Sequence, residues 1–180
     1  MIMDVIQQRR SIRQFTDQPV DRGLITDCIE AARLAPSAEN AQPWRFLVLD
    51  NPESIQAFGN AAFTGVYAQT KWAMKAPVIL VICAKLDIVA NRIGRFIQGT
   101  PYYLIDIGIA GEHVVLQAQE HGLGTCWIGW FDAKKARKHL NLPPGFKVAQ
   151  LIAMGYPLKD APNAQKRKSL DEILRFNRWV

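Results

Sequence analysis

The sequence predicts a protein of the α/β or α+β type, on the basis of three features. Helical and strand-like segments alternate along the 180 residues, as in folds that pack helices on a sheet. The composition, 49% hydrophobic and 21% charged, is that of a globular domain able to bury a core. No internal repeat, low-complexity segment or linker interrupts the chain, so residues 1–180 are expected to form a single domain.

Local signals predict the individual elements. Helical spacing of apolar residues is found at 1–10, 21–35, 100–121, 132–140 and from 169 onward, with a broken helical pattern at 52–76. Short runs typical of strands occur at 45–49, 77–83, 125–130 and 148–154. Asp21 and Asp132 are expected to begin helices, Pro36 to stop one, and Ser169 with Glu172 to form a capping box. Residues 85–99 are less regular, and we expect a mobile cover there.

The helix expected at 100–121 is unusually apolar. Thr100 should cap it, with Pro101 in its first turn and Gly122 just after its end. Apolar residues cover much of its circumference, and Gly108 and Gly111 permit close approach by a neighbour. A helix with so little polar surface must be covered on most sides. In a chain this short, a second subunit is a reasonable cover.

Several classes of protein are disfavoured by composition. No apolar run approaches the roughly 18–20 residues that span a bilayer, and no secretory signal layout is present, so a cytoplasmic location is expected. The three cysteines, Cys28, Cys83 and Cys126, are scattered among apolar neighbours, as reduced core thiols would be. The three histidines show no ligand spacing, so we expect no metal site.

The formal net charge of +6 favours an anionic partner, either a phosphorylated ligand or nucleic acid. Arg9 and Arg13 stand four residues apart and would share a face if the first helix persists, with Ser11 between them. Guanidinium and hydroxyl donors together suit a phosphate. The alternative is a solvated basic helix end. The tail cluster Lys166–Lys168 could likewise serve a ligand or solubility alone.

Two further segments offer ligand contacts. In the loop at 35–44, Asn40 and Gln42 can donate and accept hydrogen bonds, as reading the edge of a planar heterocycle requires. In the glycine-rich segment at 122–129, the glycines permit close backbone approach, and Trp127 and Ile128 offer flat apolar surface. This segment is not a dinucleotide-binding fingerprint. An ordinary loop and a capped helix followed by a buried strand are the structural alternatives.

These motifs occur in a fixed order: the basic cluster at 9–13, the Ala-Pro-Ser loop with Asn40 and Gln42, the glycine-rich segment, then Gly155-Tyr156-Pro157 and a basic tail. In order and spacing they resemble the FMN-dependent nitroreductase family, in its short subgroup, over essentially the whole chain. The resemblance implies an α+β fold with a central mixed β-sheet flanked by helices. It also implies a homodimer with two FMN molecules at the interface, which the long central helix helps to form.

The resemblance implies a set of cofactor-binding residues, namely Arg9, Arg10, Ser11, Arg13, Pro36, Ser37, Ala38, Asn40, Gln42, Gln69, Ile128, Gly129, Lys166 and Lys168. Arg9, Ser11 and the tail lysines would serve the phosphate and ribityl chain, though Arg167 could replace either lysine. Arg13 would reach the pyrimidine edge of the ring. The loop from Pro36 would come from the other subunit, and the backbone at 128–129 would face flavin N5.

The implied activity is an NAD(P)H oxidoreductase that reduces nitroaromatics, quinones or similar electron-poor molecules by a ping-pong flavin mechanism, with no catalytic side chain. A relative that fragments flavin, dehalogenates or only carries FMN is the alternative within the fold. A nucleic-acid-binding module is the alternative outside it, but no recognition helix or aromatic-basic stripe is evident. Gly129 stands where many longer members have glutamate, so only a backbone contact is implied there. Pocket-lining and core-packing roles both remain open for Phe63, Tyr67, Phe96 and Tyr102.

Overall fold

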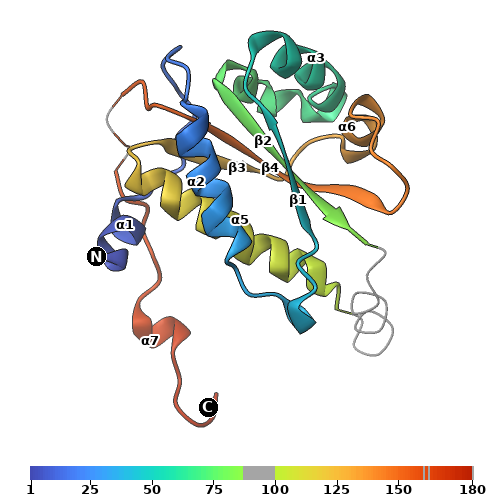
Figure 1. Cartoon of the computed structure of the whole chain (residues 1–180). Coiled ribbons are helices and arrows are strands. Elements are labelled where there is room, and N and C mark those ends of the chain that lie inside the picture. The colour runs from blue at the N-terminus through green and yellow to red at the C-terminus, as the bar shows by residue number, and fades with distance from the viewer. Residues whose placement is uncertain (87–99, 160, 162, 180) are drawn as a thin grey trace.

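The computed structural model describes residues 1–86, 100–159, 161 and 163–179. Its α-helices are α1 (Ile2–Gln8), α2 (Arg22–Arg33), α3 (Pro52–Ala62), α5 (Tyr102–Glu120), α6 (Ala133–His139) and α7 (Leu170–Ile173). Two 3₁₀ segments are η1 (Ala38–Asn40) and η2 (Gly65–Lys75). The strands are β1 (Trp44–Leu49), β2 (Val78–Lys85), β3 (Gly124–Ile128) and β4 (Phe146–Gly155) (Figure 1). Most of the cover expected at 85–99 lies outside the described residues.

The four strands form one sheet in the order β1-β2-β4-β3, and all three neighbouring pairs are antiparallel. The predicted α+β class is confirmed, but the described strands do not form the mixed sheet that was expected. Leu49 at the end of β1 pairs with Ile79 at the start of β2, so the connection through α3 and η2 begins and ends at one end of the sheet. The parallel element among the described residues is an isolated bridge between Ser11 and Thr125.

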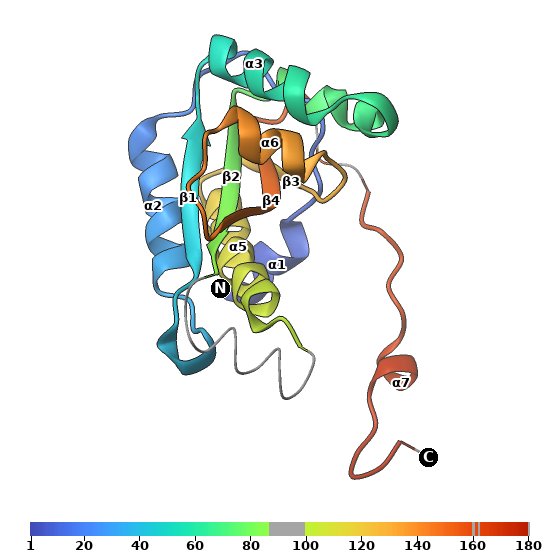
Figure 2. The same ribbon diagram turned by 90° about the vertical axis from the view of Figure 1, so that its right-hand side faces the viewer.

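Both faces of the sheet are covered, so β2, one of its two inner strands, is buried on two sides. Along β2, alternate residues enter two different cores. Leu80 and Ile82 pack with α2 and α5, whereas Ile79 and Val81 pack with α3, η2 and α6. Figures 1 and 2 show this arrangement, with α2 crossing α5 on one face and α3 and α6 on the other. This double burial explains why the strand has no polar side before Lys85.

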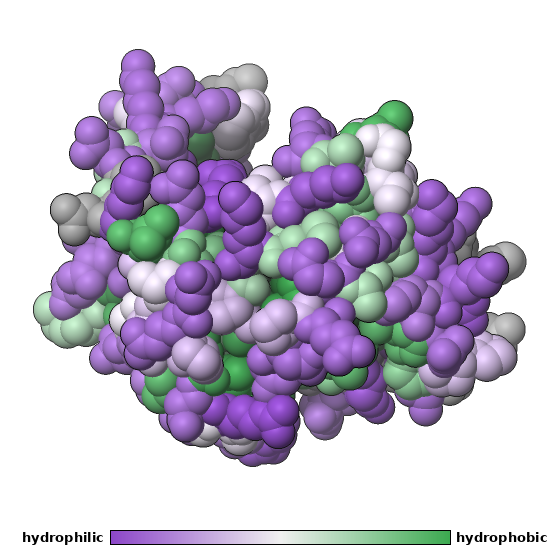
Figure 3. All heavy atoms as spheres, turned by 90° about the horizontal axis from the view of Figure 1, so that it is seen from above, coloured by the Kyte–Doolittle hydropathy of each residue, from purple (hydrophilic) through white to green (hydrophobic). Residues whose placement is uncertain are grey.

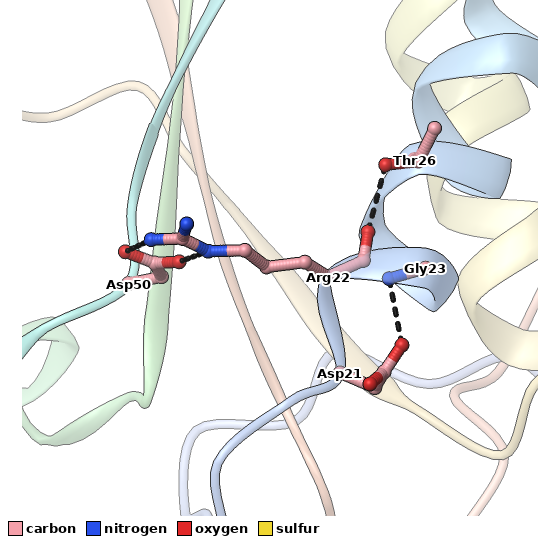
Figure 4. Close-up of polar contacts among 5 residues, drawn as sticks. All are labelled: Asp21, Arg22, Gly23, Thr26 and Asp50. Carbon is pink, nitrogen blue, oxygen red and sulfur yellow. Dashed lines mark hydrogen bonds and ion pairs between the residues drawn. The ribbon is translucent and has the colours of Figure 1, made fainter.

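Several helix boundaries are set by the residues that the sequence indicated. The Asp21 carboxylate accepts a hydrogen bond of 2.7 Å from Gly23 N–H at the start of α2. Next to it, Arg22 forms a bidentate ion pair with Asp50 after β1, at 2.6 and 3.2 Å (Figure 4). Gly122, with φ of +72°, follows α5 as predicted.

The start of α5 differs from the prediction. Its N-cap is Pro101, with φ of −79° and ψ of 81°, and it makes no side-chain capping bond. The helix begins one residue later than expected, because Pro101 itself lies outside the helical region and Tyr102 N–H bonds to the Thr100 carbonyl at 3.0 Å. At the other end of the chain, the capping box is confirmed: Glu172 accepts from the Ser169 N–H at 2.9 Å.

Beyond β4 the chain leaves the body of the protein as an extended tail that carries α7 (Figures 1 and 2). This tail exposes several large apolar side chains, those of Leu170, Ile173, Leu174, Phe176 and Trp179. The face seen in Figure 3 is mostly hydrophilic, with hydrophobic residues in separate small patches. No helix within the described residues is long and apolar enough to cross a membrane.

Candidate functional site

The N-terminal basic cluster lies on extended backbone. Helix α1 ends at Gln8, before the end expected at residue 10, so the condition under which Arg9 and Arg13 would share a helical face is not met. Instead the segment runs beside β3, where Ile12 N–H donates to the Thr125 carbonyl at 2.9 Å. Alternate residues of an extended chain point to the same side. Ile12 is therefore buried in the core, while Arg9, Ser11 and Arg13 are available on the other side.

The two ends of the chain meet at this segment. A recess of about 560 Å³ is lined by Ile6, Gln7, Arg9, Arg10, Ser11, Arg13, Asn163, Ala164, Gln165 and Arg167. Four arginines thus converge with a hydroxyl and several amide side chains. From the basic cluster of the tail, Arg167 lines the recess; Lys166 and Lys168 do not. Guanidinium groups gathered in this way bind phosphate through forked hydrogen bonds.

Two groups on neighbouring elements lie close to the arginines. Glu112 on α5 lies 4.0 Å from Arg9 Nε, and its second oxygen accepts from the Trp127 indole N–H at 3.3 Å. The Arg13 guanidinium lies 5.9 Å from the centre of the Trp72 ring, on η2. The recess is therefore joined to α5, β3 and η2. Sequence analysis missed Glu112, because a single acid within a helix carries no distinguishing signal.

The loop with Asn40 and Gln42 lies at the N-terminal end of α5 (Figure 1). Gln42 N–H donates to Ser37 Oγ at 2.9 Å, and the Gln42 amide donates to Asn40 Oδ1 at 2.9 Å. Pro36, Ser37, Ala38, Asn40 and Gln42 do not line the basic recess of the same chain as it is described. The structure thus brings the two ends of the chain together but leaves this loop apart from them.

At most positions the glycine-rich segment at 122–129 is a capped helix end followed by a buried strand, rather than a ligand-binding surface. A Cβ on Gly124 would lie 2.7 Å from Ile12, and one on Gly111 would lie 2.2 Å from the Trp127 ring. These contacts mean that Gly124 serves internal packing and that the Trp127 ring packs on α5, with Trp127 only partly exposed. Ile128 is 2% exposed, so its side chain offers no surface to a ligand. Gly129, in contrast, is exposed.

The segment after β3 is fastened to η2. Thr70 Oγ1 donates to the Trp130 carbonyl at 2.9 Å, and the Trp130 indole donates to the Val66 carbonyl at 2.8 Å. The rings of Tyr67 and Trp130 lie 5.3 Å apart. These contacts fix the backbone next to Gly129, the position expected to face the flavin.

The remaining candidate residues fall into different environments. Phe63 is fully buried and packs edge-on against Phe58, so it belongs to the core. Tyr102 is half-buried at the start of α5. Gln69 is exposed on η2 and does not line the basic recess. Phe96 lies outside the described residues.

The cysteines are buried and unpaired, as predicted. Burial raises the pKa of Cys28 to about 12 and that of Cys83 to about 11. Burial also raises the pKa of Cys126, against the opposing effect of Arg13 and Arg9. All three thiols are therefore protonated at neutral pH. Among the residues the structure describes, no group of His, Cys, Asp and Glu could hold a metal ion.

A buried carboxyl group was missed by sequence analysis. Asp106 on α5 is 3% exposed and accepts a hydrogen bond of 3.0 Å from Ala38 N–H. Burial raises its pKa, and the bond from Ala38 opposes that effect. Its position four residues before Ala110, on the apolar face of the expected helix, could have indicated a buried acid.

These features define an α+β protein with an arginine-lined anion recess built from both ends of the chain. Comparison with known proteins is more specific, because the sequence profile of the nitroreductase family matches residues 6–156. The chain belongs to the nitroreductase family. It is 29% identical to a protein of Thermus thermophilus named NADH dehydrogenase, with 85% of each chain covered.

A solved structure of a nitroreductase family protein from Clostridium difficile superimposes with a TM-score of 0.83, at 27% identity and with 99% of each chain covered. A third relative, named 5,6-dimethylbenzimidazole synthase, comes from Rhodobacter capsulatus. It is 26% identical, with 87% of this chain and 83% of that protein covered. The predicted family, fold class and NAD(P)H-dependent oxidoreductase character are confirmed.

Proposed function

We propose that this protein is an FMN-dependent NAD(P)H oxidoreductase that acts as a homodimer and reduces electron-poor small molecules such as nitroaromatics or quinones. One observation carries the proposal: arginines from the two ends of the chain line a single recess of about 560 Å³ beside β3. A dianionic phosphate needs several charged donors in one place. The family membership makes FMN the phosphate-bearing ligand of choice for this recess.

The residues present fit such a ligand. Arg9, Ser11 and Arg167 would hold the phosphate, and Arg13 would lie toward the ring. Glu112 lies 4.0 Å from Arg9 Nε, at the outer limit of an ion pair and beyond hydrogen-bonding distance, so this contact does not occupy the donors of the guanidinium. We infer that Arg167 takes the role first expected of Lys166 and Lys168, because it is the cation of that cluster that lines the recess.

The flavin, when bound, supplies the hydride-transfer chemistry. The chain's own contribution is binding, orientation and electrostatics. Arg13 would place positive charge beside the pyrimidine edge of the ring, favouring an anionic reduced state. The Gly129 N–H would donate to ring N5 from a backbone that Thr70 and Trp130 hold in place. No side-chain acid or base is assigned a catalytic role.

The homodimer is supported by a face of α5 that the described residues leave uncovered. Leu104 is 46% exposed and Ile105 is 50% exposed, and a Cβ added to Gly108 on the same helix would meet no atom within 4 Å. An apolar helix face with a glycine suits close packing against a second copy. The loop with Asn40 and Gln42 would then reach the flavin of the partner subunit. We infer a single domain over residues 1–180, and the buried thiols suit a reducing compartment such as the cytoplasm.

A second function within the family has a specific observation in its favour, the similarity to a protein named 5,6-dimethylbenzimidazole synthase. We take such a role, in which flavin is consumed, as the alternative. Rapid mixing of the FMN-loaded protein with NADPH or NADH distinguishes the two. Fast bleaching of the flavin's visible absorption followed by reoxidation with a quinone supports the oxidoreductase. Slow bleaching by both nucleotides supports the alternative.

The proposed flavin contact is tested by Arg13→Glu, which reverses one charge in the recess. FMN affinity should fall by at least about tenfold, or the potential of any bound flavin should decrease. Lys138→Glu is the matched control, because it makes the same charge change on α6, where Lys138 is exposed and far from the recess in sequence. Full FMN occupancy and an unchanged potential in Arg13→Glu would contradict the assignment. Salt-sensitive DNA binding by a colourless wild-type preparation would instead indicate a nucleic-acid module.

A further inference from the structure

Asp106 is the one carboxyl group that the described residues bury, with 3% of its surface exposed. It lies near the start of α5, between the exposed Ile105 and the buried Ile107. Its Oδ1 accepts the hydrogen bond from Ala38 N–H at 3.0 Å, across 68 positions of sequence. Burying a carboxyl group is costly unless it is hydrogen-bonded, and the other oxygen, Oδ2, is buried with no hydrogen-bond partner among the described residues. The partner of this bond is the backbone of the loop that carries Asn40.

That loop adopts a backbone that needs external support. Glu39, Asn40 and Gln42 have φ of +51°, +54° and +44°, in the left-handed region that residues with side chains rarely adopt. Non-glycine residues stay in this region only when the surrounding structure over-determines them. The loop's other hydrogen bonds to described residues are local, within Ser37–Gln42 or to Arg45 at the start of β1.

Within the described part of the chain, the Ala38–Asp106 bond is therefore the hydrogen bond that ties the loop to a helix distant in sequence. A bond that a carboxylate accepts from a backbone N–H is stronger than one between neutral groups. Residues 104 and 105, which precede Asp106, are exposed and apolar on the face of α5 proposed to meet a second copy. Helix α5 thus contacts the loop and also forms part of the proposed dimer interface.

We propose that Asp106 is a positioning residue that holds the loop over 37–42 in the shape needed to contact the flavin of the partner subunit. This inference rests on the proposed function. Asp106 touches neither flavin nor substrate; it fixes the Ala38 amide, and the loop then presents Asn40 and Gln42 at a set position relative to α5. Each site is therefore completed by a loop anchored on the other subunit's long helix.

The test compares Asp106→Ala and Asp106→Asn with Val114→Ala, a truncation of a fully buried residue on the same helix. Amide hydrogen exchange of residues 37–42 is measured without FMN, and FMN affinity is measured by titration. Asp106→Ala should speed exchange in the loop and weaken FMN binding by about tenfold or more. Asp106→Asn should keep loop exchange and FMN affinity near the wild-type values, because its carbonyl oxygen can still accept from Ala38 N–H. Val114→Ala should change neither loop exchange nor FMN affinity, even if it lowers Tm as much as Asp106→Ala does.

Ala38→Pro provides a second route if Asp106→Ala does not fold. Proline removes the N–H donor without altering Asp106, and Ser37 already has the extended backbone, φ −145° and ψ 156°, that a residue before proline prefers. Ala38→Pro should speed amide exchange in the loop and weaken FMN binding, as Asp106→Ala is expected to do. Equal loop exchange and FMN affinity in Asp106→Ala and Val114→Ala would overturn the inference. If wild-type protein binds no FMN, the proposed function fails along with the flavin role of Asp106. Unchanged loop exchange in Asp106→Ala refutes the anchoring even when the wild type binds FMN.

Discussion

Replacing Gly111 with alanine would force α5 and β3 apart at a point next to the proposed flavin site. The added Cβ would lie 2.2 Å from one carbon of the Trp127 ring and 2.9 Å and 3.1 Å from two others. Carbon atoms in contact are normally about 3.5–4.0 Å apart, so the ring must move by roughly 1 Å or more. Trp127 cannot move freely, because its indole bonds to Glu112 and its backbone pairs with Ile152.

Overpacking of this severity costs about 3 kcal/mol. Replacing a helical glycine recovers about 1 kcal/mol of helix propensity, so the net loss of stability should be about 2 kcal/mol. In a domain of this size, that lowers Tm by about 4–8 °C. Because Ile128 and Gly129 follow Trp127 directly, FMN affinity should fall as well.

Thermal unfolding and FMN titration of Gly111→Ala, both at the protein concentration used for the wild type, test this prediction. Trp127→Phe in the same chain is the control. The smaller ring makes room for the new methyl group, so the double variant should regain most of the lost Tm. A Tm equal to or above that of the wild type in Gly111→Ala would refute the packing argument, and so would a double variant less stable than either single change.

Three further substitutions have defined outcomes. Gly108→Ala would add about 1 kcal/mol of helix propensity in an isolated chain, but it should weaken self-association if α5 lies in a dimer interface. Sedimentation velocity measured over a dilution series tests this. A higher Tm with unchanged self-association would count against the interface. Gly129→Ala should change FMN affinity by no more than about threefold, because the new Cβ would meet Gln150 at an ordinary 3.5 Å and the backbone N–H is kept. Loss of the flavin would show that FMN binding requires the absence of a side chain at residue 129 as well as the N–H donor. Arg22→Gln should lower Tm by less than about 3 °C at pH 7. The Arg22 guanidinium lowers the pKa of Asp50, so this stabilisation is present above the ordinary value of 3.8 and is lost as pH falls through the lowered one. The difference in Tm should therefore shrink toward pH 3, and a difference that grew with acidity would contradict the ion pair shown in Figure 4.

The sequence predicted those parts of the fold that local signals determine. Asp21, Asp132, Gly122 and the Ser169 capping box mark their helix ends through bonds between residues no more than a few positions apart. The burial of β2 on both faces could also be predicted, since a continuous run of Val and Ile has no polar side to expose.

The features that were predicted wrongly depend on contacts distant in sequence. The segment from Arg9 to Arg13 is extended, not helical, because it pairs with Thr125, which helical spacing could not indicate. The strand directions follow from where the connection between β1 and β2 returns to the sheet. The packing of Trp127 against Gly111 likewise depends on how α5 crosses β3.

For the site, the resemblance implied that cations from both chain ends meet, with Lys166 and Lys168 expected and Arg167 as a possible replacement. Three neighbouring basic residues carry no local signal that separates them, and the path of the tail places Arg167 in the recess. Asp106 was missed for a related reason. A single acid in an apolar helix can be a solvated residue or a buried anchor, and the partner amide of Ala38 lies 68 positions away.

The central claim is that the recess formed by both ends of the chain holds FMN in a dimer. The direct measurement is size-exclusion chromatography with in-line light scattering and absorbance, after the purified protein has been incubated with excess FMN and passed through a desalting column. We predict a dimer that carries about one flavin per chain. A colourless monomer that retains no FMN would contradict the account.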